Sequence, residues 1–130
     1  MKHTFILLFL MLLTQLSFGQ TQAEMNAGAQ AEYTKAESEM NRVYAKILAE
    51  YKDDITFIEK LKISQDLWLK FRDAELEMKF PAEDKYEYYG SMYPMCAAYY
   101  LKTLTETRTK TLQGWVTPIG SDDACSGSMH

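Results

Sequence analysis

The sequence predicts an all-α fold: a small antiparallel three-helix bundle with a C-terminal tail tethered by a disulfide bond. Apolar residues recur with the spacing of amphipathic helices in three segments, and short connections join them. No segment alternates apolar and polar residues as a half-buried strand would. Two cysteines, Cys96 and Cys125, lie in the part of the chain expected to be exported, where an oxidising compartment and an even count favour one disulfide.

Residues 1–19 are expected to be an export signal. After a short basic start, Phe5 to Leu13 is an unbroken apolar run, and small residues at Ser17 and Gly19 suit a signal-peptidase cut after Gly19. The run is shorter than the roughly 20 residues of a membrane-spanning helix, although an uncleaved signal anchor is the alternative. We therefore expect a periplasmic or secreted product with no membrane anchor after cleavage.

The remaining chain is expected to form one helical domain, residues 20–116, and a tail, residues 117–130. The tail is rich in Pro, Gly, Ser and Asp, a composition that otherwise predicts disorder. A disulfide that closes the loop from Cys96 to Cys125 would stabilise the domain by roughly 3–4 kcal/mol. We expect this bond to hold the tail.

The first helix is predicted to begin at Thr21, which forms a capping-box pattern with Glu24, and to end at Lys52-Asp53-Asp54. Its apolar positions step by three or four residues, as one face of a helix does. They are Tyr33, Ala36, Met40, Tyr44, Ile47 and Tyr51.

The second helix is predicted to begin with another capping box, Thr56 and Glu59, and to end before Pro81. A single narrow polar stripe leaves most of its circumference apolar. This pattern predicts the central helix of the bundle, packed on both sides. The two apolar stripes are Ile63, Leu67, Phe71, Ala74 and Met78, and Ile58, Leu61 and Trp68.

The third helix is predicted to follow a loop from Phe80 to Gly90. Ser91 is expected to be its N-cap, Pro94 is tolerated in the first turn, and Gly114 suits its end. The seam toward the other helices is Tyr93, Ala97, Tyr100, Leu104, Arg108, Thr111 or Leu112, and Trp115.

Charge and histidine content narrow the possible functions. The chain has 18 acidic and 14 basic residues, a balance that disfavours nucleic acid and anionic lipid and favours a cationic partner, although solubility alone would explain it. The only histidines are His3 and His130, which removes Ser-His and Cys-His pairs and ordinary histidine metal sites. Carboxylates remain, mostly on solvated stripes. We expect no enzyme, no cofactor and no metal.

Tyrosines gather with acidic residues in the predicted loop. Large, rigid side chains with a polar tip are good anchors for a protein partner, and carboxylates beside them would attract a cationic one. The alternative is that the loop folds down as a lid on the core. The expected partner-binding residues are Tyr86, Tyr88, Tyr89, Glu83, Asp84 and Glu87.

Arg72 and Arg108 interrupt apolar helix faces. A buried guanidinium needs a carboxylate or several carbonyl acceptors, so we expect each to bridge the second and third helices or to reach Asp73, Glu75 or a helix-end carbonyl. Gln65 and Asn41 would join this polar network. The alternative is that the two arginines contact a ligand.

Five short motifs resemble, in order, the pattern of the LprI-like lysozyme-inhibitor family. They are Met40-Asn41-x-x-Tyr44; Gln65-x-x-Trp68; Arg72-Asp73-Ala74-Glu75; Gly90-Ser91; and Cys96 followed by Leu104-Thr105-x-x-Arg108. The resemblance covers about residues 25 to 112. It implies an exported helical domain, and it marks these residues as family positions.

The chain departs from the family pattern at its cysteines. The family often has one directly after the Arg-Asp-Ala-Glu run, where Leu76 stands, and another where Ala27 and Gly28 stand. We infer that Cys125 substitutes as the partner of Cys96.

Binding is therefore the expected function. The resemblance implies inhibition of a lysozyme-type muramidase. From the acidic, tyrosine-rich loop we expect a cationic lysozyme as the partner and non-covalent blocking of its cleft. The alternative is a non-inhibitory periplasmic interaction or stress-tolerance module. The sequence leaves the lysozyme class and the oligomeric state undetermined.

Overall fold

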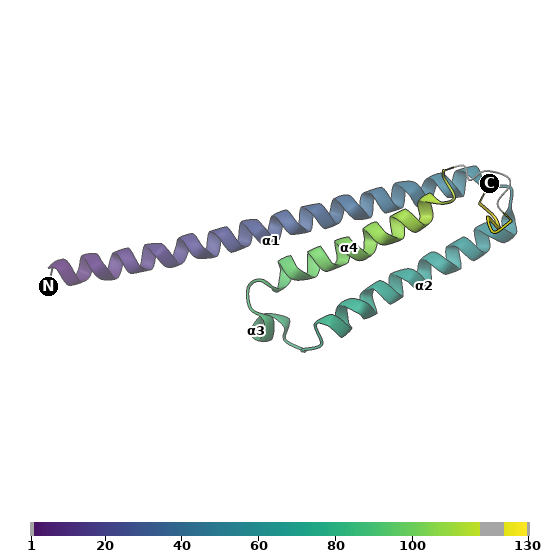
Figure 1. Ribbon diagram of the computed structural model, residues 1–130. Helices are drawn as coiled ribbons and strands as arrows, with labels where there is room; N and C mark the ends of the chain where they lie inside the picture. Colours follow the sequence, from purple (N-terminus) through teal and green to yellow (C-terminus); the bar gives the residue numbers. More distant parts are fainter. Residues whose placement is uncertain (1, 118–123, 130) are drawn as a thin grey trace.

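The computed structural model describes residues 2–117 and 124–129, with side chains from residue 21 onward, and this part of the chain is all-helical (Figure 1). The helices are α1 (Lys2–Glu50), α2 (Ile55–Lys79), α3 (Lys85–Tyr89) and α4 (Tyr93–Gln113). No strand occurs among these residues, which confirms the predicted fold class. None of the helices described there is long and apolar enough to span a membrane.

The three long helices run up, down and up. In Figure 1, α4 lies between α1 and α2, and the N-terminal part of α1 projects beyond the other helices. Among the side chains of α1 that the structure describes, from Thr21 onward, Ala29 is the first buried one, and two apolar clusters continue from it along the contact with α4. One cluster consists of Ala29, Tyr33 and Ala98; the other consists of Met40, Val43, Ile47, Tyr51, Leu61 and Leu112.

The expectation that the second helix is central was wrong, because α4 occupies that place. α2 buries only Leu61 and Gln65, whereas α4 packs along α1 and against α2. One of the two predicted apolar stripes of α2 turns toward the bundle, and the other lies in solvent. Periodicity identifies an apolar face, but it does not show whether another element covers that face.

The helix starts differ from the predicted caps. α1 begins well before Thr21. α2 is capped by Asp54, whose side chain accepts from Phe57 N at 2.9 Å, and not by Thr56. The residue before α4 is Met92, without a side-chain cap, and not Ser91. The predicted C-terminal ends of the helices agree with the structure more closely than the predicted starts. α1 stops before the Lys-Asp-Asp turn, α2 stops before Pro81, and α4 ends at Gly114.

The predicted disulfide is wrong, because Cys96 and Cys125 are not joined. Cys96 lies in the first turns of α4, whereas the described tail residues 124–129 lie near the other end of that helix, where Trp115 Nε1 donates to Ser128 Oγ at 3.0 Å. The helix from Cys96 to Gln113 spans about 25 Å at 1.5 Å per residue. A disulfide requires Cα atoms within about 7 Å.

Candidate functional site

The segment between α2 and α4, predicted as a loop, contains the short helix α3 at one end of the bundle (Figure 1). Asp84 caps this helix, since its side chain accepts from Glu87 N at 2.8 Å. Gly90 ends it with a φ of 74°, a left-handed conformation that glycine adopts without strain. Both ends of α3 are therefore fixed by local chemistry.

The three tyrosines of α3 divide between solvent and core. Tyr86 and Tyr88 are 62% and 76% exposed. Tyr89 instead packs edge-on against Phe80, with ring centroids 5.2 Å apart, and its hydroxyl accepts from Ala82 N at 3.3 Å. Each of the two sequence interpretations, an exposed surface and a lid on the core, thus holds for part of the segment.

Aromatic rings support the exposed tyrosines from below. Tyr93, at the start of α4, lies edge-on to Phe80 at 5.2 Å and to Tyr86 at 6.2 Å. Tyr88 meets Tyr89 at 4.9 Å in a similar edge-on contact. Such ring pairs each add about 0.5–1.5 kcal/mol beyond their buried area. Tyr86 and Tyr88 are therefore held on a packed base.

The charge around α3 is mainly acidic. Glu83, Asp84 and Glu87 are exposed, and a shallow hollow is formed by Ala82, Tyr88 and these three residues. Lys85 turns back instead, donating to Glu77 at 2.7 Å, and this hydrogen bond raises the pKa of Lys85. The end of the bundle thus presents carboxylates and two phenol rings to solvent.

A second group of predicted residues lies where α1 and α2 approach each other. Arg72, 12% exposed, donates to Glu37 at 3.0 Å and to Asp73 at 2.8 Å. Burial disfavours its charge, but Asp73, Tyr33 and Glu37 outweigh that cost and raise the pKa of Arg72. Burial and a hydrogen bond to Glu37 raise the pKa of Tyr33.

Arg108 lies in a different environment. It donates to Gln65 Oε1 at 3.0 Å and to Ser64 Oγ at 3.1 Å, which joins α4 to α2. No carboxylate among the described residues pairs with it, and burial lowers its pKa. Trp68 lies between the two arginines, with their guanidinium carbons 5.7 and 5.8 Å from its ring.

The other family-motif residues lie outside the groups around Arg72 and Arg108. Tyr44 packs against the core, and Thr105 is fully buried, with no hydrogen-bond partner for its hydroxyl in the part of the chain that the structure describes. Ser91 accepts through its carbonyl from Asn26 Nδ2 at 3.0 Å. Asn41 is exposed, and the hydrogen bonds that the described residues form with Arg72 and Arg108 do not include it, contrary to the expectation.

Sequence reasoning missed several partners in this network. Glu37 and Ser64 were not anticipated, and Glu75 accepts from the Tyr100 hydroxyl at 2.9 Å rather than from an arginine. The sequence did contain a signal for Glu37. It comes directly after Ala36, one of the apolar stripe positions of α1, and it lies four residues after Tyr33, so the two side chains are neighbours on the helix. Ser64 carried no comparable signal.

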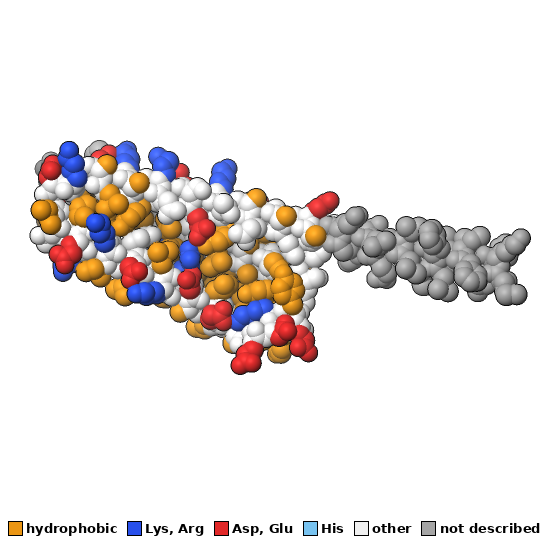
Figure 2. Space-filling model, turned by 180° about the vertical axis from the view of Figure 1, so that it is seen from behind, with side chains coloured by type: hydrophobic (Ala, Val, Ile, Leu, Met, Phe, Trp, Pro, Cys, Tyr) orange, Lys and Arg blue, Asp and Glu red, His pale blue; other side chains and the backbone are white. Residues whose placement is uncertain are grey.

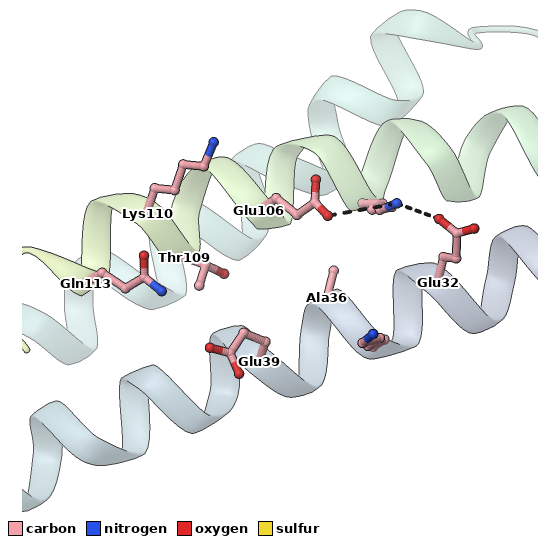
Figure 3. Close-up of a pocket in the computed structure, with 9 residues that line it drawn as sticks. Glu32, Ala36, Glu39, Glu106, Thr109, Lys110 and Gln113 are labelled. Atoms are coloured by element: carbon pink, nitrogen blue, oxygen red, sulfur yellow. Dashed lines mark hydrogen bonds and ion pairs between the residues drawn. The ribbon is translucent and has the colours of Figure 1, made fainter.

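A groove of about 720 Å³ runs between α1 and α4 (Figure 3). Charged and amide side chains line it, and Lys102 spans it by pairing with Glu32 and Glu106. Its other lining residues are Lys35, Ala36, Glu39, Thr109, Lys110 and Gln113. The described residues contain no group of three or more His, Cys, Asp or Glu placed to hold a metal ion. The groove is open, and its opposite charges neutralise one another.

Comparison with known proteins identifies the family. The model of the family described as lysozyme inhibitor LprI matches residues 15–112. The chain belongs to this LprI family. No curated protein and no solved structure gives a match. Among the motif residues, Gln65, Arg72 and Arg108 form hydrogen bonds between the long helices. The family is described as one of lysozyme inhibitors.

Proposed function

We propose that this LprI-family protein is exported and blocks a lysozyme-type muramidase without covalent chemistry. In this proposal α3 is the contact, and Tyr86 and Tyr88 enter the substrate cleft of the enzyme. The observation that carries it is the pair of exposed phenol rings on a helix that is capped at both ends and supported by packed aromatic side chains.

The physical chemistry of α3 suits this role. A protein anchor binds best when its shape is fixed beforehand, because less conformational entropy is lost in the complex. Asp84 and Gly90 supply that rigidity. The phenol rings offer apolar area for the cleft, and their hydroxyls can donate to carboxylates there.

Electrostatics supports a cationic partner. Glu83 and Glu87 flank the two tyrosines, and the whole chain carries a formal net charge of −4. Opposite charges on two proteins raise the association rate more than the final affinity. A lysozyme with a basic surface would therefore be drawn toward the α3 end, and the rate would fall as salt is added.

Export is the second part of the proposal. The first 19 residues have the composition of a signal, and the described core residues, from Ala29 onward, all lie after the expected cut at Gly19. We expect the exported protein to begin at Gln20. Amino-terminal sequencing of protein recovered from the periplasm or the medium checks this, and a retained Met1 would contradict it.

The inhibition assay tests the contact. The double variant Y86A/Y88A should keep its helical circular dichroism and raise the inhibition constant for lysozyme by roughly 100-fold or more, as the loss of two anchors does. Tyr89 is left in place because it packs against Phe80. The matched control is Y99A, which removes a tyrosine 43% exposed on α4 and should leave inhibition unchanged.

Two results would overturn the proposal in different ways. A folded Y86A/Y88A variant with unchanged inhibition would place the contact elsewhere on the protein. If the unaltered protein slows no class of lysozyme at micromolar concentration, a non-inhibitory periplasmic interaction or stress-tolerance module would replace inhibition as the function.

A further inference from the structure

The outward side of α2 carries a continuous apolar stripe in solvent. Its large members Ile63, Leu67, Phe71 and Met78 are each about half exposed or more, and the stripe is completed by the exposed Ala74. The positions step by four, four, three and four residues, so the five side chains share one helix face. We call them the outer stripe.

The outer stripe lies opposite the side of α2 that packs. Leu61 and Gln65 are buried on that other side, and Trp68 and Leu69 contact the core cluster from it. Charged side chains flank the stripe without covering it, as the exposed pair Lys70–Asp66 illustrates at 2.7 Å. Figure 2 shows apolar side chains reaching the surface of the body in patches between charged ones.

We propose that the outer stripe binds the outer stripe of a second copy of this chain, with the two α2 helices antiparallel about a two-fold axis. The spacing supports this occupant. Ile63 and Met78 lie equally far on either side of a midpoint between residues 70 and 71, and so do Leu67 and Ala74. An antiparallel copy with its axis there places Ile63 opposite Met78, and Leu67 opposite Ala74.

One of the two pairs matches a large side chain with a small one. A leucine opposite an alanine lets the helices approach closely, and the two Phe71 rings meet beside the axis. A two-fold interface requires such a self-complementary surface, because each contact is made twice. The outer stripe forms such a self-complementary surface from residues of α2 alone.

The available area is close to the lower limit for a specific dimer. If each of the four large members of the outer stripe has roughly 200 Å² of surface, within the range of an aromatic side chain, their exposed fractions give about 450 Å² per chain. Two such faces, with the stems of the flanking residues, reach the roughly 1,000 Å² in total that marks the lower limit of a specific interface. A patch of this size on a single chain is often functional.

Sedimentation of the purified protein tests the proposal. The unaltered chain should have twice the mass of one chain at micromolar concentration, and Leu67→Asp should raise the dissociation constant by roughly 100-fold. Ile55→Asp is the matched control, since Ile55 is 78% exposed on α2 but lies off the stripe. It should leave the dimer intact. A single-chain mass for the unaltered protein, or a dimer unaffected by Leu67→Asp, would overturn the proposal.

Cross-linking tests the antiparallel register. In a background with Cys96 and Cys125 replaced by serine, a short bismaleimide should join Leu67→Cys chains to Ala74→Cys chains when the two are mixed. Leu67→Cys chains alone should cross-link weakly, because the axis separates the two thiols by about 10 Å along the helices. Equal cross-linking in both samples would refute this register. Loss of lysozyme inhibition in Leu67→Asp, with a monomeric unaltered protein, would assign the stripe to the enzyme instead.

Discussion

The contact between α1 and α4 and the contact of α2 with the bundle are built from different side chains. The first has an apolar centre that runs from Ala29 to Tyr51 on α1, with Ala97 and Ala98 allowing close approach on α4, and charged side chains line the groove at its edge. In the second, α2 buries two residues, and one of them is Gln65. Arginine hydrogen bonds supply much of the remainder.

The two contacts therefore have different roles: one stabilises the bundle, and the other fixes the position of α2 along its neighbours. Apolar burial stabilises a contact in proportion to area and without strong direction, so α1 and α4 can hold each other by packing alone. Hydrogen bonds to Arg72 and Arg108 have directional geometry and fix where α2 lies along its neighbours. The opposite side of α2 takes no part in this attachment, and its apolar side chains are exposed to solvent.

The largest expected effect lies in the α1–α4 contact. Ile47→Ala empties a fully buried site and should lower the free energy of unfolding by about 3 kcal/mol. Ile55→Ala makes the same chemical change at an exposed position of α2 and should change it by no more than about 0.5 kcal/mol. Urea denaturation measures both, and equal losses would remove the distinction between the two regions.

The next largest effect tests the polar attachment of α2. Arg72→Met keeps an apolar stem of similar length but loses the guanidinium hydrogen bonds to Glu37 and Asp73, and should cost about 2 kcal/mol. Arg42→Met is the matched control, since its pair with Glu39 is exposed, and should cost no more than about 0.5 kcal/mol.

A double-mutant cycle sharpens the Arg72 test. Combined with Glu37→Gln, Arg72→Met should show a coupling energy of about 1 kcal/mol. Additive effects of the two substitutions would mean that Arg72 stabilises α2 by packing on Trp68 and not through α1.

Most of the fold followed from periodicity and helix-end signals in the sequence. The buried side chains of α1 from Tyr33 to Tyr51 include five of its six predicted stripe positions, because an amphipathic helix that packs on one side has one apolar face. α2 broke the rule. Its outer stripe has the same pattern as a buried face, and only the position of α4 shows that the stripe is in solvent.

The candidate site was less predictable. The tyrosines of α3 are alike in sequence, yet Tyr89 packs against Phe80 while Tyr88 is exposed, a difference set by the direction of a five-residue helix. The disulfide failed for a related reason. Compartment and cysteine count indicate that two thiols can bond, but only the path of the chain gives their separation.

Gln65 offers a smaller test of the same attachment. Gln65→Ala removes the acceptor for Arg108 Nε from a buried position and should lower the free energy of unfolding by about 1–2 kcal/mol. Gln113→Ala, at an exposed position of α4, should have an effect within about 0.5 kcal/mol. Similar results for the two variants would show that water replaces the amide beside Arg108 at little cost.

The smallest effect concerns the start of α2, which has little packing to hold it. Asp54→Ala removes the side chain that accepts from Phe57 N and should cost about 1 kcal/mol. Thr56→Ala, at the position where the sequence alone suggests a cap, should change stability by less than about 0.5 kcal/mol. Thermal unfolding of the two variants measures which substitution lowers the stability more. A larger loss for Thr56→Ala would move the helix start to that residue and shorten the helix that carries the outer stripe.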